Sequence, residues 1–324
     1  MLNVIARSNA TRLSKATGCT RLWIAILTLV VTAWSTVATA CERPRDYQSI
    51  LTRPNQALLY KVEKCGVPVQ YVFGTFHSDS PDLTPLAAMA GDYIRQSDQL
   101  NLEIVMTPLD QKRAHFFMLL PSGSPDLPDV IGTDMFMQVR KKLLPLIGLS
   151  PMAAKRYQPW AIAILAQYPK PEGDGMVLDS RLQAIAAQAQ VPVDSLEDVD
   201  DQFEIFTEMN KQEAFYFLEH TLEQVDTLEA DLVELKRLYL NRDLTGIYEM
   251  SRRVFGELAE KDAGLARYLE EELIDKRNIR MAQAMEEDFD KTTLTAVGAL
   301  HLPGEKGILY LLEQDGYTIT PLEN

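Results

Sequence analysis

Two copies of one short pattern constrain the fold of this chain more than any other feature. Apolar runs at residues 71–74 and 296–298 each end at a glycine, and a histidine, His77 or His301, follows three positions later. The chain has only four histidines, so half of them share this setting. A glycine lets the backbone turn tightly where a strand ends, and open α/β sheets bind ligands beyond the carboxyl ends of their strands. The repetition predicts two strands of one α/β sheet with both histidines at its edge.

A third strand-like run, residues 99–106, carries an acid in an apolar setting. Alternation places Leu100 and Leu102 on one face and Glu103 on the other. A glutamate here reaches the carboxyl end of the strand, pairs with a cation, or is solvated on an edge strand. The first reading brings Glu103 to the same edge as the two histidines.

Two imidazoles and one carboxylate leave open positions on a divalent ion, so His77, Glu103 and His301 together predict a reactive metal centre. Each Gly-x-x-His pattern taken singly is also typical of an ordinary turn histidine. The other two histidines, His115 and His220, lie in expected helices without a matching partner and are interpreted as structural or solvated. Phosphate-loop, dinucleotide and Gly-x-Ser-x-Gly motifs do not occur in the sequence, which disfavours nucleotide and serine-hydrolase chemistry.

The order of the remaining patterns predicts the fold class. A hairpin is expected at residues 57–62 and 67–74, a helix then a short strand at 178–194, and strands at 293–298 and 317–320. Residues 198–288 show no strand pattern and contain long acidic amphipathic helices, whose Phe and Leu stripes predict core rather than a peptide groove. We expect an α/β fold with a central mixed sheet, flanking helices and a largely helical insertion, about 198–288, in the second half.

The first forty residues have the layout of a secretory signal. They contain four basic residues and no acid, an apolar run over 22–34, and a small-residue tripeptide before Cys41. We expect residues 1–40 to be a cleaved signal peptide and 41–324 to form a single periplasmic or secreted domain. An uncleaved anchor, an organelle transit peptide and a lipid on Cys41 are the alternatives, and membrane contact is expected only with an uncleaved signal or a lipidated Cys41.

The net charge restricts the class of binding partner, and the cysteine content bears on disulfide formation in the expected compartment. Loss of the leader takes the formal charge from −14 to −18, which disfavours nucleic-acid binding because phosphate recognition needs clustered Lys and Arg. Cys41 and Cys65 would remain as an even pair, and in an oxidising compartment they predict a disulfide, with two unpaired thiols as the alternative.

Several motifs, in order along the chain, resemble the TraB/GumN family, whose eukaryotic relatives include the Tiki metalloproteases. The matching residues are 71–77, Leu102-Glu103, Pro159-Trp160, Leu178-Asp179, Arg277-Asn278 with Met281, 297–302 and Gly316-Tyr317. The resemblance implies an active site of His77, Glu103 and His301 that uses a divalent metal such as manganese or cobalt to cut peptides. It also implies that Arg277 and Asn278 lie near the site in a charge-stabilising or positioning role, the alternative being a surface arginine at a helix C-terminus.

The function predicted from these features is a secreted or periplasmic metal-dependent hydrolase of the peptidase type, with a peptide or small-molecule substrate. Its expected metal ligands are His77, Glu103 and His301, and its expected catalytic residues are Glu103, Arg277 and Asn278. The resemblance also implies a wider superfamily that includes erythromycin-esterase-like enzymes, which use His and Glu as acid and base, and a haem-binding lipoprotein, which is no hydrolase. A metal-free His/Glu esterase and a non-catalytic binding protein for haem, metal or a small ligand are therefore the alternatives.

Overall fold

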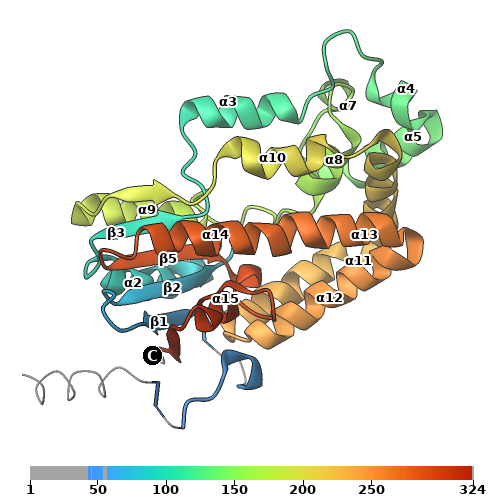
Figure 1. Ribbon diagram of the computed structural model, residues 1–324. Coiled ribbons are helices and arrows are strands. Elements are labelled where there is room, and N and C mark those ends of the chain that lie inside the picture. Colours follow the sequence, from blue (N-terminus) through green and yellow to red (C-terminus); the bar gives the residue numbers. More distant parts are fainter. Residues whose placement is uncertain (1–42, 45, 54–56, 323–324) are drawn as a thin grey trace, which may run out of the picture. The chain divides into compact units, whose positions relative to one another are not determined.

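The computed structural model describes residues 43–44, 46–53 and 57–322 (Figure 1). Residues from Gln48 onward form one compact unit. The expected signal peptide and Cys41 lie outside the described residues, so the signal and the Cys41–Cys65 disulfide stay predictions. Within the described part of the chain, no helix is both long and apolar enough to cross a membrane.

A six-stranded mixed sheet lies at the centre of this unit. Its strands are β1 (Leu59–Glu63), β2 (Gln70–Thr75), β3 (Gln99–Leu102), β4 (Val193–Ser195), β5 (Thr293–Gly298) and β6 (Thr318–Pro321), in the spatial order β4-β3-β5-β2-β1-β6. Strands β4, β3, β5 and β2 are parallel neighbours, whereas β1 runs antiparallel to both β2 and β6. The predicted hairpin is the β1–β2 pair.

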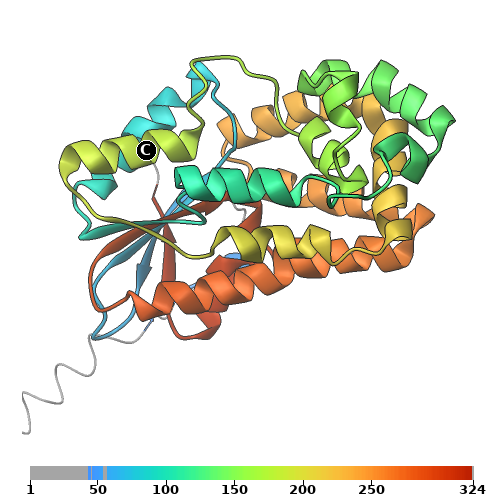
Figure 2. The same ribbon diagram turned by 90° about the horizontal axis from the view of Figure 1, so that it is seen from above.

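Helices cover both faces of the sheet. Helices α2 (Thr84–Ile94) and α9 (Leu178–Ala189) lie on one side of the strands, and α14 (Lys276–Glu287) and α15 (Ile308–Gln314) lie on the other (Figure 2). Strands covered on both faces are buried along their length, and in β5 every residue from Thr293 to Val297 is buried. This arrangement confirms the predicted α/β class with a mixed sheet and flanking helices.

A second hydrophobic core lies among the helices beyond the sheet. These helices are α3 (Pro108–Phe117), α4 (Leu127–Ile131), α5 (Thr133–Lys142), α6 (Leu144–Ile147), α7 (Pro151–Ala154), α8 (Pro159–Ala166), α10 (Val199–Thr207), α11 (Lys211–Leu240), α12 (Leu244–Lys261) and α13 (Ala263–Glu270). Trp160 stacks on Phe206 at 5.1 Å between ring centroids, and Phe217 and Leu218 are buried in the same cluster. Most of the aromatic and leucine stripes of the helical segment therefore form core, whereas Leu228 and Leu232 line a cavity. The helical second half is confirmed.

Two local features differ from the sequence-based expectations. Strand β3 ends at Leu102, opposite the last residue of β4, so Glu103 lies one residue beyond the strand rather than within it. Arg277 lies in the first turn of α14, not at a helix C-terminus. The turn before it, η3 (Glu271–Asp275), is π-helical and joins α13 to α14 without a break, and such π-turns are frequent at functional sites.

Candidate functional site

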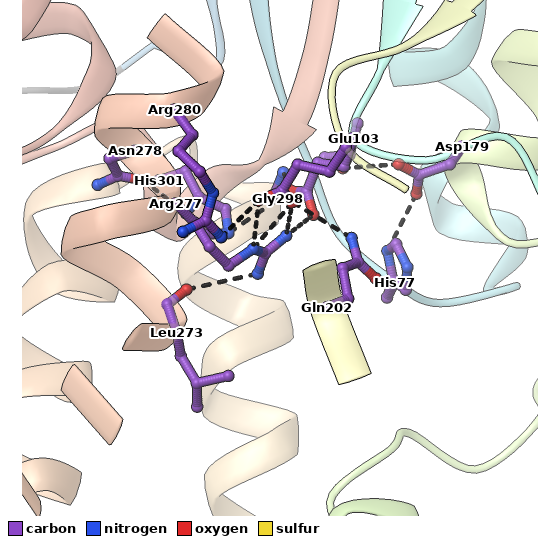
Figure 3. Close-up of polar contacts among 12 residues, drawn as sticks. His77, Glu103, Asp179, Gln202, Leu273, Arg277, Asn278, Arg280, Gly298 and His301 are labelled. Atoms are coloured by element: carbon purple, nitrogen blue, oxygen red, sulfur yellow. Dashed lines mark hydrogen bonds and ion pairs between the residues drawn. The ribbon is translucent and has the colours of Figure 1, made fainter. Parts of the chain in front are cut away.

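The parallel strands bring the three predicted residues to one edge of the sheet. Thr75 of β2 is in register with Gly298 of β5, and Leu102 of β3 is in register with Ala296 of β5. Because the strands run in the same direction, the segments that follow them emerge together. His77, Glu103 and His301 therefore come from three adjacent strand ends. Figure 3 shows their side chains together with those of Arg277 and Asn278 of α14.

Glu103 is the most constrained of the three. Gln99 and Asn101 share its face of β3, and both bond Asp288 just after α14. Glu103 therefore points toward the same helix, where Nη2 of Arg277 donates to its Oε2 at 2.8 Å. The Gly298 amide donates to the other carboxylate oxygen. The alternation within the strand thus placed this side chain on the correct face.

The surroundings of Glu103 keep its carboxylate ionised. Burial alone would raise its pKa, but the positive charge that His301 takes on in acid, the charge of Arg277 and the Gly298 N–H outweigh burial and lower the pKa to about 2. A Cβ on Gly298 would lie 3.1 Å from Oε1 of Glu103. Glycine at this position therefore lets the carboxylate approach the backbone as closely as it does.

Arg277 bridges two buried carboxylates. Its Nε and Nη2 donate to Oε2 of Glu197 at 2.9 and 2.8 Å, and Nη2 also bonds Glu103. The Glu197 side chain is 1% exposed, and Arg280 reaches it from the solvent side at 3.4 Å. The alternative reading of Arg277 as a surface arginine is wrong, because the α13–η3–α14 helix lays this residue over the strand ends.

Glu197 is a site residue that sequence reasoning missed. It follows β4 as Glu103 follows β3, and the two strands are parallel neighbours. The Glu197 amide donates to the backbone oxygen of Glu103 at 3.0 Å. The available sequence signal was an acid shortly after a predicted strand. Only the pairing of β3 with β4 shows that this acid lies beside Glu103.

His301 is buried and held in one tautomer by its neighbour Asn278. Its Nδ1 lies 2.6 Å from Oδ1 of Asn278, whose Nδ2 donates to the backbone oxygen of Lys306 at 2.9 Å. The amide is thereby oriented, so Nδ1 carries the proton and donates it, and Nε2 presents a lone pair. Burial lowers the pKa of His301 to about 4, which favours this neutral ring.

The lone pair on Nε2 of His301 faces Oε1 of Glu103 at 3.6 Å. Both atoms are acceptors when the ring is neutral and the carboxylate ionised, so this geometry calls for a cation or a proton donor between them. Two ligand atoms of one ion, each about 2.1 Å from it, lie about 3 to 3.5 Å apart. The separation of the two acceptors is close to that of two ligands of one metal.

His77 lies at the more open end of the site, with its side chain 50% exposed. Its Nδ1 is 3.1 Å from Oδ2 of Asp179, in the first turn of α9, and Thr75 donates to the other oxygen of that carboxylate at 3.1 Å. Partial burial opposes protonation of His77, but the hydrogen bond and charge of Asp179 and the charge of Glu103 outweigh it and raise the pKa to about 9. The ring presents Nε2 on the side away from Asp179.

The donor chemistry fits a divalent ion, although the ligand set is incomplete. Nδ1 of each imidazole faces a side-chain oxygen, as is usual for metal-binding histidines, which leaves Nε2 of each ring for an ion. Within the described residues, no group of three His, Cys, Asp or Glu side chains is arranged to hold a metal. His301 and Glu103 would hold the ion, and His77 would have to approach them to become a third ligand.

A loop beside the site is tied to the His77 turn by Asp79. The buried Asp79 carboxylate accepts backbone N–H groups of Glu172 at 2.8 Å and of Gly173 and Gly175 at 3.0 Å. These bonds, that of Glu172 first, lower the pKa of Asp79 below its ordinary range. A Cβ on Gly173 would lie 2.3 Å from the Asp79 backbone oxygen, so glycine is required for this approach. Sequence reasoning gave no sign of this clamp.

The remaining histidines lie away from the trio, in keeping with their structural interpretation. His115 is exposed on α3 and lies 3.5 Å from the hydroxyl of Tyr157, and His220 is buried on α11.

Comparison with known proteins gives one result of consequence. No curated protein and no solved structure gives a significant match. The sequence profile of the TraB/PrgY/gumN family matches residues 58–321, which include all six strands and the candidate site. The predicted resemblance is confirmed, and the chain belongs to the TraB/PrgY/gumN family.

Proposed function

We propose that this protein is a metal-dependent hydrolase of the peptidase type, secreted or periplasmic, with its site at His77, Glu103 and His301. The observation that carries the proposal is the pair of acceptor atoms, Nε2 of His301 and Oε1 of Glu103, that face each other at 3.6 Å. A divalent cation satisfies both, and the family resemblance suggests manganese or cobalt. A bound ion would polarise a substrate carbonyl and lower the pKa of water.

The side chains around this pair have separate proposed roles. Oε2 of Glu103 accepts one bond from Arg277, keeps a second lone pair and would accept a proton from an attacking water. His77, steadied by Asp179 and half exposed, would donate a proton to the leaving group. Arg277 would stabilise negative charge on Glu103 and on the substrate, and Asn278 would hold the His301 tautomer.

Metal analysis of the purified protein tests this proposal. We expect about one divalent ion per chain, lost in His301→Ala and Glu103→Gln and retained in the control His115→Ala, whose side chain is exposed on α3. Peptide hydrolysis should stop in chelator and return on addition of Mn²⁺ or Co²⁺. Equal metal content in all four proteins would refute the metal site.

A second candidate is metal-free hydrolysis by acid–base catalysis. The specific observation that favours it is the His77–Asp179 pair, in which a carboxylate orients an imidazole at the mouth of the site, as in acid–base dyads. Hydrolysis that persists in strong chelator and is abolished by His77→Ala would select this mechanism. Titration with haem, followed by absorbance, tests the non-catalytic binding alternative.

A further inference from the structure

A cavity of about 630 Å³ adjoins the chain segment that carries His77, although His77 itself does not line it. Phe76 and Ser78, the two neighbours of His77 in the chain, form part of its wall. The rest of the wall comes from residues 225–236 of α11, from Ala166 at the end of α8, from residues 168–172 of the loop that follows it, and from Lys142 and Leu146. A volume of this size lies in the range of pockets that bind small-molecule ligands.

Every charged side chain that lines the cavity is paired with an opposite charge that also lines it. Lys142 lies 3.6 Å from Asp226, Lys170 lies 3.2 Å from Glu229, and Lys236 lies 2.6 Å from Glu172. Three cations and three acids therefore cancel, and a charged ligand group would find no unpaired partner. Burying such a group without a partner is costly, so the wall disfavours charged ligands.

The uncharged part of the lining is almost entirely apolar. Helix α11 contributes four aliphatic side chains, and the loop contributes Tyr168 with two prolines, a rigid apolar strip. The aliphatic residues are Val225, Leu228, Leu232 and Val233. A second cavity, about 580 Å³, adjoins Asn278 but is lined by charged groups such as Arg252, Arg267 and Glu270. The two sides of the site therefore differ in polarity.

We propose that the cavity beside His77 binds uncharged apolar side chains of a peptide substrate next to the bond that is cleaved. The cleavage part of this inference rests on the proposed function, whereas binding of an apolar group does not. The volume exceeds that of a single side chain, so more than one apolar side chain of the substrate can enter it.

Binding of the neutral fluorescent probe N-phenyl-1-naphthylamine to the purified protein tests the cavity without requiring activity. Leu228→Trp fills the cavity from a half-buried position of α11, and Val254→Trp makes the same change at a 40% exposed position of α12 that does not line it. We expect Leu228→Trp to weaken probe binding at least about tenfold, because the indole occupies space in the cavity and so removes apolar contacts of the probe. We expect Val254→Trp to leave probe binding unchanged.

Competition and cleavage then identify the occupant. N-acetyl-Leu-Leu-amide should displace the probe and N-acetyl-Lys-Lys-amide should not, and peptide cleavage should favour apolar residues beside the cut. Absence of probe binding, equal binding by wild type and Leu228→Trp, or displacement by decanoate but not by the dileucine amide would overturn the inference. Selective probe binding without cleavage of any peptide would refute the proposed hydrolase alone and leave the apolar cavity standing.

Discussion

Replacement of Arg277 by Met removes the guanidinium that bonds both Glu103 and Glu197, whose side chains are 14% and 1% exposed. Removal of one partner from a buried ion pair costs about 3–5 kcal/mol, because the other charge stays buried without compensation. The pKa of Glu103, lowered to about 2 against burial by the charges of His301 and Arg277, is consistent with this sign. We therefore expect Arg277→Met to lower the free energy of unfolding by about 3 kcal/mol or more.

The pH dependence of this loss has a definite sign. A carboxylate whose pKa is lowered in the folded state contributes stability above its unfolded pKa and loses it as pH falls toward the folded value. For Glu103 that window runs from 4.5 down to about 2. The difference between wild type and Arg277→Met should thus be largest near neutral pH and shrink below about pH 4.5.

Urea unfolding followed by circular dichroism, with chelator present, measures both quantities. Arg280→Met is the matched control, because Arg280 also reaches Glu197, at 3.4 Å, but its side chain is 42% exposed. Such an exposed pair contributes at most about 1 kcal/mol. Equal losses in the two variants, or a loss in Arg277→Met that does not change between neutral and acidic pH, would contradict the assigned ion-pair network.

Three further changes test the geometry around the pair. Gly298→Ala should weaken Mn²⁺ or Co²⁺ binding, measured by calorimetry, because its Cβ would lie 3.1 Å from Oε1 of Glu103, and wild-type affinity would count against that contact. Asn278→Leu should weaken the same binding about 10- to 100-fold, since it frees the ring of His301, and an unchanged affinity would speak against the tautomer assignment. Asp79→Asn should speed amide hydrogen exchange at Glu172, Gly173 and Gly175, because the uncharged amide would hold their N–H groups less well. Unaltered exchange there would show that the clamp does not depend on the carboxylate.

The helical segment shows what hydrophobic periodicity alone can predict and what it cannot. Its amphipathic stripes predicted long helices and a buried face, and α11 indeed buries Phe217, Leu218 and Leu222. The same pattern gave no indication that α13 and α14 join through a π-turn, or that this turn would place Arg277 over the strand ends. Periodicity identifies which face is buried, but the partner of that face depends on the path of the whole chain.

For the site itself, the sequence determined the ends of β2 and β5 to within one residue, the two Gly-x-x-His turns and the face of Glu103, because strand alternation and glycine turns act over a few residues. Only the tertiary structure decided which groups meet there. Arg277 is 174 positions from Glu103 and 80 from Glu197, and Asp179 reaches the His77 turn from the start of α9. Such contacts follow from strand order and helix placement, which the packing of the complete chain fixes. Local sequence pattern could therefore predict His77, Glu103 and His301 as site residues, but not the buried charges that hold them in place.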